Sequence, residues 1–95
     1  MREYELVVVL SPELGDEDVP TAFDKISQFV AGRGGEVTEV NRWGRRKLAY
    51  PIRRHQEGSY VVSQVKLDPQ TAAELEANLR ISEDVLRHLL VRAGE

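Results

Sequence analysis

Residues 42–54 read Arg-Trp-Gly-Arg-Arg-Lys-Leu-Ala-Tyr-Pro-Ile-Arg-Arg, and they form the far end of a long predicted strand and the start of its hairpin. A glycine within a strand pattern indicates a bulge or bend, which we expect at Gly44. Proline has no amide hydrogen to donate to a neighbouring strand, so Pro51 marks a sheet edge or a strand terminus. We expect residues 53–58 to form the hairpin loop that leads into the next strand.

The chain before this stretch begins with a strand. Residues 3–10 alternate in a way that places the even-numbered side chains, from Tyr4 to Leu10, on the core face. Val7 and Val9 are also apolar, although they belong to the opposite face. The sequence therefore predicts that a partner or a neighbouring strand covers part of that second face.

A helix is expected next. Between residues 19 and 30 apolar side chains recur three and four positions apart, which is the pattern of an amphipathic helix. Asp16 or Asp18 is a candidate cap, and Pro20 suits the first turn. Glycines at positions 32, 34 and 35 are expected to end the helix, because glycine accepts a left-handed cap.

The remaining elements repeat the same order. Asp68 followed by proline predicts a helix start, and Leu75 and Leu79 contribute to a short apolar stripe on that helix. Residues 81–84, which are polar after Ile81, are expected to turn. The expected elements after the first helix are strands at 36–52 and 59–67, a helix at 69–80 and a strand at 85–92.

Strand, helix, strand, strand, helix, strand is the order of a ferredoxin-like α+β sandwich, with two helices on one face of a four-stranded antiparallel sheet. Ninety-five residues suffice for one such domain, covering residues 1–95. Right-handed crossovers place the first and third strands at the centre and the second and fourth at the edges. The basic stretch is therefore predicted to lie on an edge strand and its hairpin.

Positive charge is concentrated in this stretch. Residues 42–56 contain six of the thirteen Lys and Arg residues and no acid. Residues 1–41 have three bases and nine acids, and residues 57–95 have four bases and seven acids. Trp43 and Tyr50 lie among the cations. Cations neutralise phosphates and aromatic rings stack on bases, so the composition favours a local nucleic-acid contact in an otherwise acidic chain.

The sequence offers no catalytic or metal-binding constellation. There is no cysteine, His55 and His88 lack metal-ligand spacing, and no serine has a neighbouring histidine. The loop at 11–18 is acidic and would repel a phosphate. The charged start at residues 1–5 does not fit a signal peptide, and no apolar run is long enough to cross a membrane. We expect a cytoplasmic protein that is not an enzyme and has no cofactor.

A family resemblance extends over essentially the whole chain. The motif Trp-Gly-Arg-Arg-Lys-Leu-Ala-Tyr-Pro-Ile at 43–52 resembles the signature of the sixth protein of the bacterial small ribosomal subunit. The opening residues 1–5 and the closing segments 79–81 and 84–87 are similar to the same family. The resemblance implies a structural protein of the ribosome that binds the central domain of small-subunit rRNA as a heterodimer with the eighteenth small-subunit protein. It implies no small-molecule substrate.

The resemblance also implies site residues. We expect one set of arginines to meet rRNA phosphates or partner carboxylates, and a smaller set of residues to build the apolar part of a protein contact. The first set is Arg2, Arg45, Arg46, Arg80, Arg87 and Arg92, and the second is Trp43, Leu48 and Tyr50.

Two alternatives have the same topology. One is a small-molecule-binding regulatory domain and the other is an acylphosphatase-like hydrolase, because a fold of this kind does not fix a function. Trp43 also has two interpretations. It is either a core residue of the sandwich or an exposed edge residue that packs on a partner, and the neighbouring Arg42, Gly44 and Arg45 favour the second.

Overall fold

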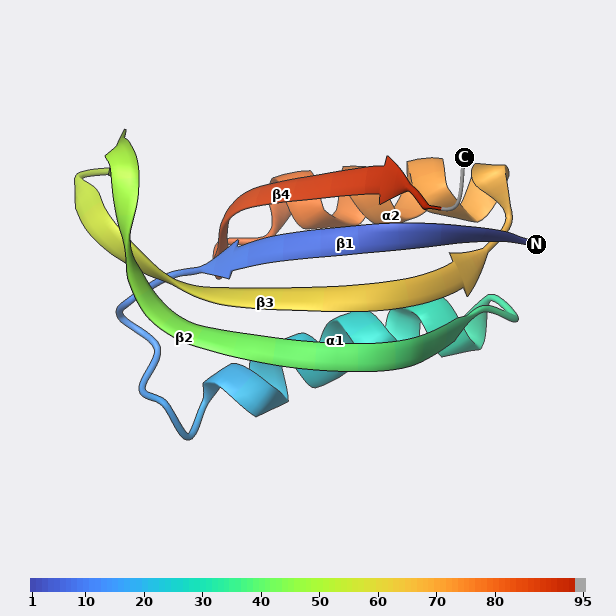
Figure 1. The fold of residues 1–95 in the computed structure, drawn as a ribbon, viewed down its shortest axis with the longest axis horizontal. Helices are drawn as coiled ribbons and strands as arrows, with labels where there is room; N and C mark the ends of the chain where they lie inside the picture. Colours follow the sequence, from blue (N-terminus) through green and yellow to red (C-terminus); the bar gives the residue numbers. More distant parts are fainter. Residues whose placement is uncertain (94–95) are drawn as a thin grey trace.

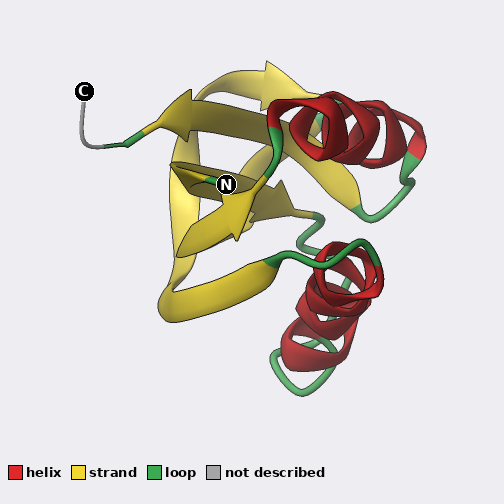
Figure 2. Cartoon of the chain, turned by 90° about the vertical axis from the view of Figure 1, so that its right-hand side faces the viewer, coloured by secondary structure: helices red, strands yellow, loops and turns green. Residues whose placement is uncertain are grey.

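The computed structural model describes residues 1–93 and has the predicted order of elements. The strands form one antiparallel sheet in the order β2-β3-β1-β4, and both helices cover the same face of it (Figures 1 and 2). This confirms the ferredoxin-like fold, with the first and third strands central. The elements are β1 Arg2–Leu10, α1 Val19–Gly32, β2 Glu36–Ile52, β3 His55–Leu67, α2 Pro69–Ile81 and β4 Val85–Arg92.

The core lies between the sheet and the helices. The even-numbered side chains of β1 point into it as predicted, and Leu6, Val8 and Leu10 are fully buried. Burying a side chain of this size stabilises the fold by about 1.5–3 kcal/mol. The helices and the other strands complete the core with Val19, Phe23, Ile26, Val30, Val61, Val65, Leu67, Ala72, Leu75, Leu79 and Val85.

The helix starts differ from the prediction in one respect. Asp18 and Asp68 occupy the N-cap positions, but neither side chain caps its helix. Asp18 has helical dihedral angles (φ −90°, ψ −17°), whereas a capping side chain reaches the first-turn amides from an extended residue. Asp68 is extended, but its carboxylate lies 3.8 Å from the amino group of Met1. The prolines in the first turn are present in both helices as predicted.

The hairpin after β2 is tighter than predicted. The expected loop at 53–58 is wrong, because β3 already begins at His55 and pairs with Ile52. Only Arg53 and Arg54 form the turn, with φ of 50° and 71°. Two successive left-handed residues are the mark of a type I′ hairpin turn, for which Asn-Gly is the usual sequence signal. Arg-Arg gives no such signal, so the turn was not recognisable.

Gly44 bends β2 as expected. Its φ is +82°, and the pairing with β3 shifts by one residue between Arg42 and Gly44. Arg42 pairs with Val61 and Gly44 with Tyr60, so Trp43 is the extra residue of a β-bulge. A bulge bends and twists its strand. The far half of β2 and the start of β3 accordingly form a twisted two-stranded arm that extends past the ends of β1 and β4 (Figure 1).

Candidate nucleic-acid and partner interface

The arm carries the basic cluster, which we define as Arg42, Arg45, Arg46, Lys47, Arg53 and Arg54. All of these residues are exposed. No acidic residue interrupts the segment between Arg42 and Gln56, so the local field is positive although the whole chain has a net charge of −3. A positive surface of this kind attracts phosphate and concentrates it near the protein.

Trp43 lies at the surface and not in the core. Its exposed fraction is 53%, and its ring is stacked on Tyr60, with the centroids 6.3 Å apart and the planes inclined by 10°. The guanidinium of Arg46 lies over the indole, 5.1 Å from its centroid. The bulge releases Trp43 from regular pairing, and the result is a layered contact of cation, indole and phenol. Such a contact fixes Arg46 while leaving it accessible to an anion.

Tyr50 and Leu48 have different surroundings although both were predicted to contact a partner. Tyr50 is 56% exposed, and Arg87 on β4 approaches its hydroxyl with Nη1 at 3.5 Å. Leu48 is half-buried and lies near Gly58. The arm therefore brings Tyr50 to the opposite edge strand of the sheet, and only Trp43 and Tyr50 are well exposed.

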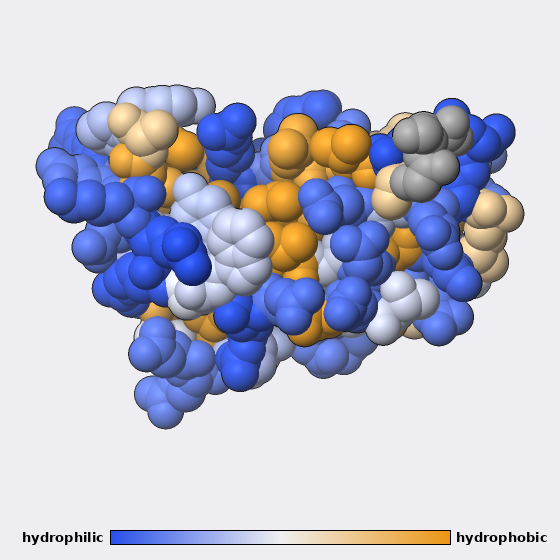
Figure 3. Space-filling view, viewed as in Figure 1, coloured by the Kyte–Doolittle hydropathy of each residue, from blue (hydrophilic) through white to orange (hydrophobic). Residues whose placement is uncertain are grey.

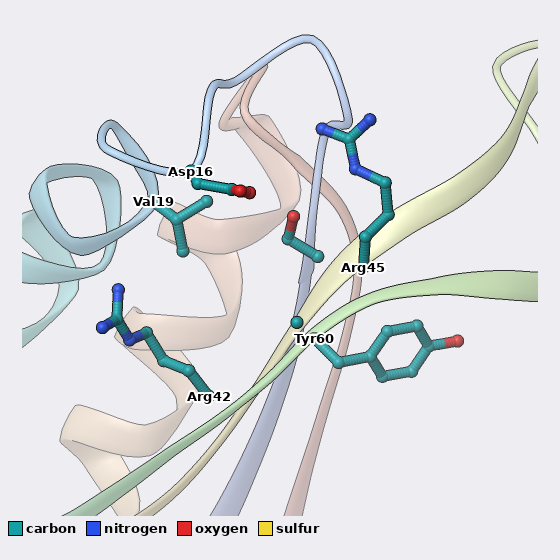
Figure 4. A pocket seen from close by; sticks show the side chains of 7 residues that line it. Asp16, Val19, Arg42, Arg45 and Tyr60 are labelled. Carbon is teal, nitrogen blue, oxygen red and sulfur yellow. The ribbon is translucent and has the colours of Figure 1, made fainter.

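Arg45 borders an open hollow of about 620 Å³ between the loop at 11–18, the start of α1 and the strands β2 and β3. Figure 4 shows Arg42 and Arg45 on two sides of this hollow, with Asp16 at its rim and the ring of Tyr60 directed away from it. Arg45 Nη2 donates a hydrogen bond to the carbonyl of Pro12 at 2.9 Å. Arg42 was not among the predicted site residues, although the basic run around it was a sufficient signal.

Arg80 and Arg87 come together with the hairpin turn. They line a second hollow, of about 290 Å³, together with Arg53. Arg53 also donates a hydrogen bond to the carbonyl of Glu83 at 3.4 Å, which ties the turn to the segment between α2 and β4. Sequence reasoning did not single out Arg53, because its approach to Arg80 and Arg87 depends on the twist of the arm.

Arg2 and Arg92 lie at the other end of the sheet. Arg2 pairs with Leu67 at the beginning of β1, and Arg92 pairs with Tyr4 near the same end. The six predicted arginines are thus divided between the hairpin end, with Arg45, Arg46, Arg80 and Arg87, and the opposite end of the molecule. Their contacts with RNA or a partner stay predictions.

Histidines and carboxylates do not gather into a metal site in the part of the chain that the structure describes. Within residues 1–93 there is no cluster of three or more potential metal ligands. His55 is engaged with Glu13 at 3.2 Å from Nε2 to Oε2. No helix among these residues has the length and apolar character needed to cross a membrane.

Comparison with known protein families shows which family the chain belongs to. The model of the family described as ribosomal protein S6 matches residues 3–92. The chain belongs to the ribosomal protein S6 family. The fold and the exposed basic arm are therefore features of a protein of the small ribosomal subunit, as the resemblance predicted.

Members of the family are similar to this chain over nearly its whole length. The small ribosomal subunit protein bS6 of Desulforamulus reducens is 40% identical over 95 residues, which is all of both chains. That of Dehalococcoides mccartyi strain 195 is 44% identical and is matched over 87% of its length by the whole of this chain. The crystal structure of 30S ribosomal protein S6 from Thermotoga maritima superposes with a TM-score of 0.87 at 29% identity, covering 96% of this chain and 86% of the other.

Membership in this family decides between the functional classes. Its members are named as a protein of the small ribosomal subunit and not as an enzyme, which confirms the prediction that the chain is not an enzyme. The regulatory domain and the acylphosphatase-like hydrolase have no support among these relatives. The chain is accordingly a protein of the small ribosomal subunit.

Proposed function

We propose that the protein binds the central domain of small-subunit rRNA together with the eighteenth small-subunit protein. The observation that carries the proposal is the basic cluster on the arm. Six exposed cations lie within fifteen residues of a chain that is otherwise acidic. Phosphate contacts supply most of the affinity of such surfaces, and the negative remainder of the chain restricts the contact to this region.

The basic and the aromatic residues of this surface have different roles in the proposal. Arg45 and Arg46, with Arg80 and Arg87, contact phosphates. Trp43 and Tyr50 cover apolar surface of the partner protein, because large exposed aromatic rings at the rim of a charged patch are typical energetic anchors of interfaces. Leu48 supports the aromatic residues from the half-buried side of the strand.

The salt dependence of RNA binding tests the role of the basic cluster. In the double variant Arg45→Gln/Arg46→Gln we expect weaker binding to a central-domain rRNA fragment. The slope of log K against log salt should become shallower by about 0.9 for each lost phosphate contact in a duplex and about 0.7 in a single strand. A filter-binding titration at several salt concentrations, with the partner protein present, measures both quantities.

A matched control removes two positive charges elsewhere. Lys25→Gln/Arg33→Gln changes the net charge by the same amount, but both residues lie on or beside α1, away from the arm. The control should keep the wild-type slope. Circular dichroism verifies that the arm variant still folds, because Arg45 also binds the carbonyl of Pro12. An unchanged slope in the folded arm variant would show that these arginines do not contact phosphate.

A further inference from the structure

The turn of the arm, the end of α2 and the start of β4 lie at the same end of the molecule (Figure 1). Each contributes one arginine to the hollow of about 290 Å³, namely Arg53 from the turn, Arg80 from the last turn of α2 and Arg87 from β4. All three side chains are exposed. In Figure 3 hydrophilic side chains gather over the hairpin end of the sheet, whereas apolar side chains occupy the middle of the same face. Three cations from separate parts of the chain therefore border one open space.

No carboxylate balances these three cations. The remaining lining residues of the hollow are Leu79, Val85, Leu86 and His88, and none of them is acidic. Within residues 1–93 none of the three arginines forms an ion pair with an acid. Arg33 on the other side of the molecule does have such a partner, because its Nε lies 3.4 Å from Oε1 of Glu74. The positive charge of the hollow is therefore left for a ligand to neutralise.

The acids nearest in sequence line a different hollow. Glu83 and Asp84, which come just before β4, border a neighbouring space of about 530 Å³ together with Glu13 and His55. Arg53 lies between the two hollows, but Glu83 offers it only a carbonyl oxygen, at 3.4 Å from Nη1. Negative charge is thus kept on one side of Arg53, and the other arginines lie on the opposite side.

Two of the guanidinium groups are oriented by neutral acceptors. Arg53 donates to the carbonyl of Glu83, and Nη1 of Arg87 donates to the hydroxyl of Tyr50 at 3.5 Å. A guanidinium has five N–H donors, so each of these contacts leaves most of the donors available. The planar fork of a guanidinium matches two oxygens of a phosphate group. Oriented arginines without a carboxylate partner are therefore suited to hold a phosphate.

We propose that the hollow receives a single phosphate of the bound RNA backbone, which Arg53, Arg80 and Arg87 hold together. The inference rests on the proposed function, in which Arg80 and Arg87 contact phosphates, and it adds Arg53 and the sharing of one phosphate by all three. Arg53 belongs to the arm, whereas the other two belong to α2 and β4. The bound phosphate therefore also ties the turn of the arm to the body of the domain.

Replacing single phosphates in the RNA tests whether one of them is shared. In a central-domain rRNA fragment, one linkage at a time is changed to a neutral methylphosphonate beside a 2′-O-methyl nucleotide, and the affinity is measured with the partner protein present. The same 2′-O-methyl nucleotide with an ordinary phosphate is the control for the modification. We expect a linkage at which neutralisation weakens wild-type binding by roughly tenfold or more, because hydrogen bonds to a charged group are lost.

The protein variants identify which arginines hold that phosphate. In Arg53→Gln, Arg80→Gln and Arg87→Gln the penalty at this same linkage should shrink to roughly threefold or less, because groups that bind one phosphate are coupled. Arg54→Gln is the matched comparison, since it removes the same charge from the next position of the turn but does not line the hollow. It should keep the whole penalty at this linkage, whatever its effect on the overall affinity.

Inorganic phosphate tests the source of the ligand, because it presents similar oxygens. It is titrated into the RNA-free protein at constant ionic strength, with chloride as the control and the amide resonances of residues 85–88 as the readout. We expect saturation only at about 1 mM or above, if at all, since the rest of the RNA holds its phosphate in place. Saturation at a concentration roughly a hundredfold lower would identify free phosphate as the ligand and overturn the RNA assignment.

Two results of the linkage experiment would also overturn the inference. One is a loss of penalties at three different linkages in the three variants. The other is an Arg53→Gln variant that keeps the whole penalty at a linkage to which Arg80→Gln and Arg87→Gln both respond. The salt slope of Arg45→Gln/Arg46→Gln separates these failures from a failure of the proposed function. If that slope is still shallower than in the wild type, rRNA binding by the arm stands and only the shared phosphate is wrong.

Discussion

The indole of Trp43 lies nearly parallel to the ring of Tyr60, inclined by only 10°, on the face of the sheet opposite the helices. The two residues belong to neighbouring strands, and Trp43 is the extra residue of the bulge before Gly44. Arg42 pairs with Val61, whose side chain faces the helices, so the next residue of β2 faces the opposite side of the sheet. There the rings of Trp43 and Tyr60 stack and form a surface platform for Arg46.

Because Trp43 is exposed, we expect its removal to lower the affinity for the partner protein more than the stability of the fold. In Trp43→Ala we expect a loss of about 1 kcal/mol in the free energy of unfolding, because the stacking on Tyr60 is lost but little core is opened. Affinity for the partner protein should fall by about 2 kcal/mol or more. Thermal melting and a partner titration of the same variant measure the two effects.

Ile81→Ala is the matched control for Trp43→Ala. Ile81 is also exposed and apolar, but it ends α2 and lies away from the arm. The Ile81→Ala variant should therefore have the same affinity for the partner protein as the wild type. A stability loss of about 3–5 kcal/mol in Trp43→Ala, with normal partner affinity of the folded fraction, would return Trp43 to a core role and remove it from the interface.

The charge distribution predicts a dependence on the partner protein. Outside the basic cluster the chain has seven bases and sixteen acids. This part of the chain is therefore negatively charged and repels a phosphate backbone. The protein alone should therefore bind the rRNA fragment more weakly than the pair, by roughly tenfold or more, since a few additional phosphate contacts have that effect. Gel-shift titrations at one salt concentration compare the two. Equal affinities would contradict the proposed joint surface.

The arrangement of elements was predictable because each has a strong local signal. Alternation in β1 and helical spacing in α1 determine which faces are buried, and Pro20 and Pro69 mark the helix starts. The order of the strands then follows from the handedness of the crossovers. The bulge at Gly44 was predicted correctly, because no other residue type so readily accepts the positive φ that Gly44 has.

The missed features depend on tertiary structure. Asp16 or Asp18 was expected to cap α1, but Asp18 at the N-cap position has a helical conformation and makes no capping hydrogen bond. The approach of Arg53 to Arg80 and Arg87 needs the twist of the arm, and the separation of Arg2 from the arm needs the sheet register. Spacing along the chain contains neither of these relationships.

The left-handed turn at Arg53 and Arg54 predicts that the hairpin can be stabilised. A left-handed conformation costs an ordinary residue about 1–2 kcal/mol, and Asn-Gly is the preferred pair for this turn. The double variant Arg53→Asn/Arg54→Gly should therefore raise the free energy of unfolding by about 1 kcal/mol. Arg53→Ala/Arg54→Ala removes the same charges but keeps the β-carbons, so it should give no gain. Urea denaturation measures the free energy of unfolding of both double variants. Equal values for the two would show that the turn is not strained.

Gly58 is predicted to be necessary where β3 passes the end of β1. A β-carbon there would overlap Cγ1 of Val9 and lie 3.2 Å from the carbonyl oxygen of Leu10. Gly58→Ala should therefore cost about 1–3 kcal/mol of folding stability, as overpacking does. Gly32→Ala is the control, because no atom within 4 Å obstructs its β-carbon.

Shortening Val9, the residue that a side chain at position 58 would overlap, tests the cause of the loss. In Gly58→Ala/Val9→Ala the loss should be smaller than the sum of the single losses, because residues in contact are coupled. Additive losses in urea denaturation would show that Val9 is not what excludes a side chain at Gly58.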